Sequence, residues 1–185
     1  MKRILLCMCF FVGMIITGRS QTKNFKKFKV DLGIGYAIPV TSGSGAVGGV
    51  TFTIQPHYRI SDDFAAGLRF EGAALGYKTG SSSDTKVSIS ILSSYCATGE
   101  YYLKKSGFRP FVGAGLGMFS FASIDFGKDN NGQAIVSPVV SKFGFFPTIG
   151  FETGHFRMSA EYNSLPEKTG YLAFKLGFFF GGGKK

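Results

Sequence analysis

The chain has 185 residues, 44% of them hydrophobic, which is enough for one domain with a full core and too few for us to expect two. Its 21 basic and 11 acidic residues give a formal net charge of +10. Three cysteines exclude a dense disulfide framework, and neither His57 nor His155 lies in a ligand-spaced motif, so we expect no metal site.

The N-terminus has the three-part layout of a secretory signal peptide. Two basic residues precede an apolar run over residues 4–17, and small residues follow at Gly18 and Ser20. The run is shorter than the roughly 20 apolar residues of a membrane-spanning helix, which is the alternative interpretation. We therefore expect residues 1–20 to be removed after Ser20 and the mature protein to be exported.

Removal of this segment changes the cysteine count and the charge. Cys96 is then the single remaining cysteine, so no internal disulfide or thiolate cluster can form. The mature chain keeps 18 basic and 11 acidic residues, a balance of +7. Export argues against nucleic acid as the partner of this basic chain. The densest basic run, KNFKKFK at residues 23–29, overlaps a short arm predicted at residues 21–26, and we interpret it as a solvated arm or a contact for anionic lipid head groups.

Beyond residue 26 the dominant pattern has a period of two, and no window has a convincing helical stripe. In each segment, large apolar residues alternate with small or polar ones. Pro56 interrupts one of them, because proline removes a donor from the ladder of hydrogen bonds. The sequence therefore predicts eight strands, at about residues 28–38, 48–60, 64–76, 86–102, 108–121, 142–152, 155–163 and 171–180.

The fifth segment, FRPFVGAGLGMFSF, contains glycines at positions 113, 115 and 117 that resemble a phosphate-binding loop. The dinucleotide fingerprint requires a third glycine where this chain has Met118, and no amphipathic helix follows. We interpret these glycines as packing residues that make room for larger side chains across a barrel.

The connections alternate in length. The short connections SDD, KKSG and TG follow the second, fourth and sixth segments, and longer connections follow the odd-numbered segments. Asn131-Gly132 marks a hairpin tip in the longest connection. This asymmetry is typical of barrels with short periplasmic turns and long extracellular loops. The predicted fold is all-β, an eight-stranded antiparallel up-and-down transmembrane β-barrel over residues 27–180, followed by a Gly/Lys tail at 181–185.

Composition indicates which face points inward. The more polar face is rich in glycine, alanine, serine and threonine, which suits a narrow lumen, whereas the face that carries most of the 21 phenylalanines suits lipid. Buried charges must be paired. We predict an interior charge network with a structural role, and the alternative is proton or ion handling. Its members are Arg69, Glu71, Glu100, Glu152, Arg157, Glu161 and Lys175.

Three stretches, RPFVGAGLGMF, FGFFPTIGFE and the aromatic YLAFKLGFFF near the end, resemble the small outer-membrane β-barrel family of Gram-negative bacteria, represented by OmpX and the barrel of OmpA. The resemblance covers about residues 27–180. It implies an outer-membrane location and recognition of the final aromatic strand by the outer-membrane assembly machinery. The glycine and lysine residues after that strand and the absence of tryptophan depart from the family pattern.

These observations predict an integral outer-membrane barrel that is not an enzyme, has a structural or surface-interaction role through its extracellular loops, and has a filled polar interior rather than an open pore. We expect a monomer without cofactor or catalytic residues, in contact with outer-membrane lipid, and a loop partner of unknown identity. The alternative is a secreted or periplasmic soluble barrel that binds a small apolar ligand. A lipid-modifying enzyme would need Ser120 or Ser123 to meet His155, and no local motif joins them.

Overall fold

The computed structural model describes residues 24–40, 45–79, 86–125, 135–136, 138–166 and 169–183. The predicted signal peptide, the Asn131-Gly132 hairpin tip and the last two residues of the predicted tail lie outside these ranges. The described chain forms β1 (Phe28–Pro39), β2 (Gly45–Arg59), β3 (Phe64–Thr79), β4 (Lys86–Tyr102), β5 (Arg109–Asp125), β6 (Ile135–Val136), β7 (Val140–Thr153), β8 (Phe156–Leu165) and β9 (Thr169–Gly181).

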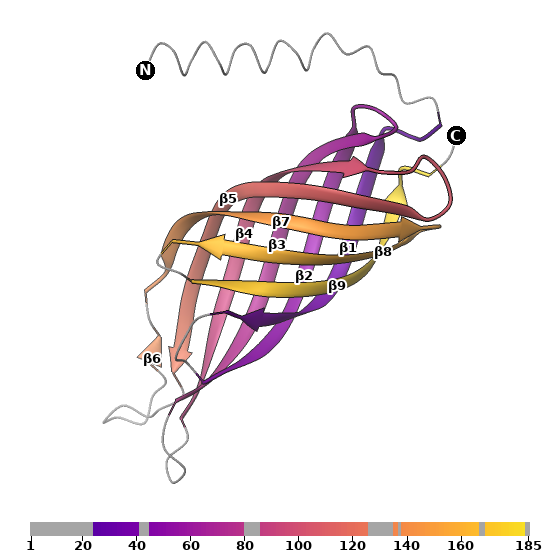
Figure 1. Ribbon diagram of the computed structural model, residues 1–185. Coiled ribbons are helices and arrows are strands. Elements are labelled where there is room, and N and C mark those ends of the chain that lie inside the picture. The colour runs from indigo at the N-terminus through magenta and orange to yellow at the C-terminus, as the bar shows by residue number, and fades with distance from the viewer. Residues whose placement is uncertain are drawn as a thin grey trace, which may run out of the picture.

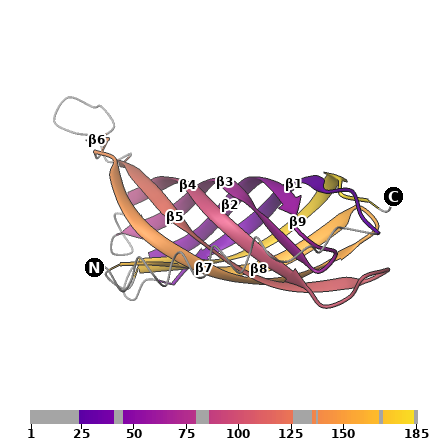
Figure 2. The same cartoon turned by 90° about the horizontal axis from the view of Figure 1, so that it is seen from above.

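The eight long strands form one closed antiparallel barrel. Each pairs with its neighbours in the chain, β5 pairs with β7, and β9 pairs with β1 to close the sheet. The strands wrap obliquely around a common lumen (Figure 1), and their tilt is clear when the barrel is viewed from above (Figure 2). The predicted eight-stranded antiparallel barrel is confirmed, and the predicted strand limits differ from the observed ones by a few residues. The two-residue β6, which extends the edge of β5, was not predicted.

The barrel has two different ends. The connections after β2, β4 and β7 are short and lie at one end, which we call the turn end. At the last of these, Gly154 has a φ of 59°, a left-handed conformation that glycine adopts without strain. The backbone amide of Lys26 donates a hydrogen bond of 2.9 Å to the carbonyl of Gly183, so the described chain begins and finishes at the turn end. The connections after β1, β3, β5 and β8 lie at the opposite end, which we call the loop end. Of these, only the connection between β5 and β7, residues 126–139, is longer than every turn, and the one after β8 is limited to residues 166–168. The alternation in length predicted from the sequence is therefore largely not observed, because the strands extend further than predicted at the loop end.

The outer face of the barrel is apolar along the length of the strands. Large hydrophobic side chains remain exposed on all eight long strands, among them Ile34, Phe52, Leu116, Ile149 and Phe178. The alternation read from the sequence therefore corresponds to an apolar exterior and a more polar lumen.

No helix within the described residues is long and apolar enough to cross a membrane.

Inside the barrel, aromatic rings pack against glycines on the neighbouring strand. Gly115 is the register partner of Phe146, and a Cβ atom at Gly115 would collide with the Phe146 ring. Gly150 likewise faces Phe111, whose ring lies 2.6 Å from the position a Cβ would take. Gly115 thus provides space for a bulky lumen residue, which is the packing role predicted from the sequence, whereas a Cβ atom at Gly117 would meet the backbone of Tyr95 and Cys96 instead.

An apolar layer of buried side chains lies in the part of the lumen nearer the loop end. Its buried residues come from seven of the eight long strands, all except β2, and include the inward-pointing rings of β5 and β7. The members are Ala37, Ala73, Leu75, Leu92, Cys96, Phe119, Phe146, Leu165, Tyr171 and Ala173. The charged side chains therefore lie in the middle of the barrel and toward the turn end.

Candidate functional site

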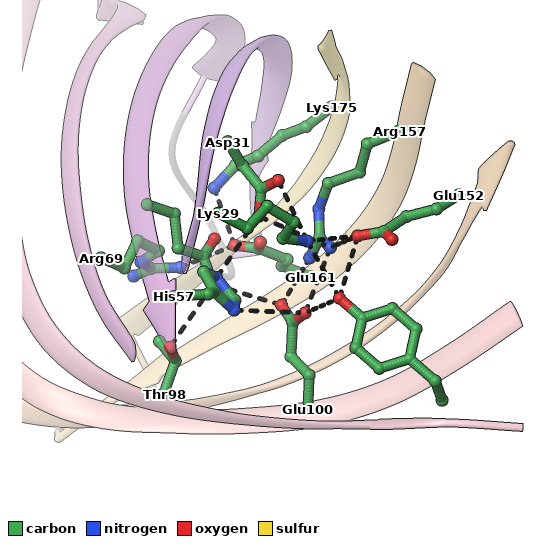
Figure 3. Close-up of polar contacts among 12 residues, drawn as sticks. Lys29, Asp31, His57, Arg69, Thr98, Glu100, Glu152, Arg157, Glu161 and Lys175 are labelled. Atoms are coloured by element: carbon green, nitrogen blue, oxygen red, sulfur yellow. Dashed lines mark hydrogen bonds and ion pairs between the residues drawn. The ribbon is translucent and has the colours of Figure 1, made fainter. Parts of the chain in front are cut away.

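The lumen contains all seven residues of the predicted interior charge network, each at most 6% exposed. They come from five strands on different sides of the barrel, and the six of them that Figure 3 labels, all but Glu71, extend into the lumen. The structure divides them between two clusters, one in the middle of the barrel and one nearer the turn end.

The central cluster contains two cations and two carboxylates. Arg69 Nη1 lies 2.6 Å from Glu161 Oε2, and Lys175 Nζ lies 2.7 Å from the same oxygen. Lys175 also forms an ion pair with Glu71, which accepts a further hydrogen bond from the Tyr171 hydroxyl. The guanidinium carbon of Arg69 lies 3.5 Å from the centroid of the Phe146 ring. Charges of both signs are thus balanced and hydrogen-bonded across the lumen, as burial requires.

The turn-end cluster is built around Glu100 and Glu152. Arg157 binds both carboxylates, with Nη1 2.9 Å from Glu152 Oε1 and Nη2 in contact with Glu100. Lys29 forms an ion pair with Glu152 and lies 3.1 Å from Asp31. The Tyr102 hydroxyl is 2.9 Å from oxygens of both glutamates.

Five charged or titratable members of this cluster were missing from the predicted network: Lys29, Asp31, His57, Arg59 and Arg109. The interpretation of Lys29 as part of a solvated or lipid-contacting basic run is wrong, because its side chain is fully buried in the lumen. All five lie on the polar face of the alternating pattern. Their position on this face could have identified them from the sequence. Lys29 was missed because it lies in a dense run of lysines.

His57 lies between two carboxylates inside this cluster. Its Nε2 is 3.4 Å from Asp31 Oδ2 and its Nδ1 is 3.6 Å from Glu100 Oε2, and neither nitrogen has a hydrogen-bond partner. The described residues contain no group of three or more histidine, cysteine, aspartate or glutamate side chains placed to hold a metal ion.

The N-terminal arm docks on the turn end. The Phe25 side chain is 5% exposed, and its ring covers the guanidinium groups of Arg59 and Arg109, with centroid distances of 4.6 and 4.1 Å. Asn24 hydrogen-bonds to the carboxylate of Asp62 in the turn after β2. For the described part of the arm, the prediction of a solvated segment therefore holds for the exposed Lys26 but not for Phe25.

Little space remains between the two clusters. A cavity of about 20 Å³ lies among Asp31, Thr53, Arg157, Glu161 and Lys175, which is room for about one water molecule. A pocket with a mainly apolar lining lies instead on the outer face, among Ile34, Phe52, Phe174 and neighbouring side chains. A soluble carrier of an apolar ligand requires the reverse arrangement.

The residues considered for a hydrolytic site do not meet. Ser120 and Ser123 lie in the half of β5 nearer the loop end, and the Ser120 hydroxyl is 2.8 Å from that of Ser141. His155 lies in the turn between β7 and β8, at the opposite end, with its ring 5.3 Å from that of Phe179. This combination therefore forms no nucleophile and base pair.

The fold resembles those of known outer-membrane barrels. Ail, the attachment invasion locus protein of Yersinia pestis, in its complex with the heparin analogue sucrose octasulfate, aligns with a TM-score of 0.53 and 17% identity over 83% of this chain and 99% of Ail. Neisserial surface protein A aligns with a TM-score of 0.53 and 18% identity over 83% of this chain and 96% of its own.

The outer membrane protein OprG from Pseudomonas aeruginosa aligns with a TM-score of 0.53 and 13% identity over 88% of this chain and 99% of OprG. No family model and no curated protein sequence matches the chain. At these identities the similarity is one of fold, and the chain has the fold of the small eight-stranded outer-membrane barrels.

Proposed function

We propose that this chain, with the fold of the small eight-stranded outer-membrane barrels, is an integral outer-membrane protein that acts without catalysis and presents the connections of its loop end to a partner outside the cell. The observation that carries the proposal is the distribution of side chains over the two faces of the sheet. Apolar residues cover the outside, while charged residues are collected and paired inside.

This distribution suits lipid as the surrounding medium. Every backbone amide and carbonyl group in hydrocarbon needs a partner, and a closed sheet supplies partners on both edges of each strand. An exterior with so many exposed large hydrophobic side chains would be poorly solvated in water. Export through a cleaved segment at residues 1–20 provides the route, and the aromatic strand β9 is the proposed signal for the assembly machinery.

The proposed role of the interior is structural. Two clusters of ion pairs and an apolar layer fill the lumen in place of a wide water channel, which agrees with the capacity of eight strands. The seven residues Arg69, Glu71, Glu100, Glu152, Arg157, Glu161 and Lys175 then join strands across the barrel. A monomer is sufficient, because the ion pairs among these seven residues all form within one chain.

Membrane fractionation followed by gel electrophoresis with and without boiling tests the proposal. We expect to find the mature chain in the outer-membrane fraction. Its electrophoretic mobility should change on heating, as for a closed detergent-resistant barrel. A chain that stays in the soluble fraction and whose mobility does not change would refute the membrane location. Protease treatment of intact cells then tests the orientation. We expect cleavage in the connections of the loop end and protection of the connections of the turn end.

A further inference from the structure

A pair of buried arginines at the turn end has too few acceptors. Among the described residues, the turn-end cluster contains four permanent cations, Lys29, Arg59, Arg109 and Arg157, against three carboxylates, Asp31, Glu100 and Glu152.

The carboxylate of Glu152 contacts all four of these cations. Its Oε1 binds Lys29 and Arg157, while its Oε2 is left to Arg59 and Arg109, at 3.4 and 3.6 Å. The two arginines at its outer side are therefore held by longer contacts than the ion pairs deeper in the barrel, and share one oxygen.

Arg59 has unused donors. Its side chain is 1% exposed, and its Nε and Nη1 atoms have no hydrogen-bond partner. Arg109 is better satisfied, because its Nε and Nη2 donate to the backbone carbonyls of Lys104 and Asp62 at 3.1 and 3.0 Å. A buried guanidinium with two unpaired donors is costly, and a further acceptor would relieve that cost.

The two guanidinium groups lie side by side between aromatic rings. Phe25 covers both on one side, and Tyr102 lies 5.2 Å from Arg59 and 4.3 Å from Arg109 on centroid distances. Next to them is a cavity of about 330 Å³, bounded by Phe25, Arg109, Glu152, His155 and Phe179 together with glycines of the turns and the C-terminal segment. Phe25 lines this cavity and stacks on Arg59, whereas Arg59 itself does not line it, so we expect removal of the ring to open the cavity toward Arg59.

We propose that this turn-end cavity binds the phosphate group of a small soluble molecule between Arg59 and Arg109, with the ring of Phe25 as a displaceable cover. A phosphate offers several acceptor oxygens, so it can accept from two guanidinium forks at once, whereas a single carboxylate matches one fork. The cavity lies at the turn end, and none of the exposed apolar side chains of the outer face lines it, which favours a soluble ligand over a lipid head group.

Inorganic phosphate is the probe, titrated into the folded mature chain in a zwitterionic detergent at constant ionic strength and followed by calorimetry. We expect saturable binding of one phosphate per chain. The Phe25→Ala variant should bind at least three times more tightly, because it uncovers Arg59. Absence of saturable binding in both proteins would overturn the proposal.

Variants of the arginines identify the site. In the Phe25→Ala background, Arg59→Lys and Arg109→Lys keep the charge of the cluster and so avoid the risk of misfolding, but they lose the planar fork, and each should weaken binding about tenfold or more. Lys105→Gln, which removes an exposed charge at the same end, should leave binding unchanged. Loss of binding in Lys105→Gln without loss in the two arginine variants would indicate attraction to net charge and contradict the assignment. Displacement of phosphate by anionic phospholipid but not by glycerol phosphate would contradict a soluble ligand.

Discussion

Gly115 and Leu116 are neighbours in β5 and point to opposite faces of the same sheet. Leu116 is 55% exposed on the outside, where any large apolar side chain would fit. Gly115 is buried in the lumen against one particular ring, that of Phe146. The outer face thus requires only that a side chain be apolar, whereas the inner face requires side chains that fit particular neighbours. Substitutions on the two faces should therefore fail for different reasons.

The largest effect is expected for a carboxylate of the inner face. Glu152→Gln keeps the shape of the side chain but leaves four cations around a neutral amide, and we expect a loss of about 3–5 kcal/mol of unfolding free energy. The chain has no tryptophan, so denaturant titration in lipid vesicles should be followed by circular dichroism or by the heat-dependent gel mobility. Asp63→Asn makes the same chemical change in an outer turn and is the control. If both variants had equal midpoints, the interior network would not contribute to stability.

A charge on the outer face is the next largest perturbation. Leu116 lies near the middle of β5, and Leu116→Arg should cost about 2–4 kcal/mol in a bilayer, the range for a basic residue at the midplane of a barrel. Leu116→Val is the matched control and should be close to neutral. In a micelle that can deform around the guanidinium, the cost should shrink. An arginine tolerated equally well in vesicles would mean that this face does not meet lipid.

A smaller effect is expected from adding one methyl group to the inner face. Gly115→Ala places a Cβ against the Phe146 ring and 2.9 Å from the Ala97 carbonyl oxygen, which should cost about 1–3 kcal/mol as overpacking. Phe146→Leu in the same chain should recover part of that loss. The double-mutant cycle measures the coupling between the two residues, and simple additivity would exclude the proposed contact.

The smallest effect on stability is expected in the turns, which belong to neither face of the sheet. Lys105 Nζ lies 3.0 Å from Asp63 Oδ2, and this hydrogen bond and the negative charge of Asp63 raise the pKa of Lys105 above its ordinary value. Because the pKa is raised on folding, the pair contributes at neutral pH and its contribution is lost as the pH rises through the folded pKa. The contribution is screened by solvent. An NMR titration of Lys105 should give a lower midpoint in Asp63→Asn, and an unchanged midpoint would show that the pair does not form in solution.

The period-two pattern was sufficient to predict the eight strands and the face on which each residue lies, because side chains alternate strictly across a pleated sheet. It could not predict partners across the lumen. Arg69 and Glu161 are 92 positions apart, and their contact depends on the tilt and stagger with which the barrel closes. Their pairing therefore required the three-dimensional structure.

The prediction from local composition was wrong for Lys29, in the densest basic run of the chain. Lys29 stands in a run of lysines that reads as solvated, yet it is the first inward position of β1 and is fully buried. Phe25 precedes the first strand, so no alternation constrains it, and its position over two arginines follows from the docking of the arm. Short pairings such as β6 also carry no periodic signal, because two residues are too few to define a period.

The closing pair of strands has a consequence for how the molecule is made. Lys29 pairs with Gly181 across the seam between β1 and β9, so the two strands that complete the ring are the first and the last to be synthesised. Lys175 of β9 holds Glu71 of β3, and that carboxylate has no ammonium partner until β9 is in place. An unfinished sheet would therefore expose both a strand edge and unmatched charges. Truncated chains should have no stable partial form, and assembly should proceed as a single late and cooperative event.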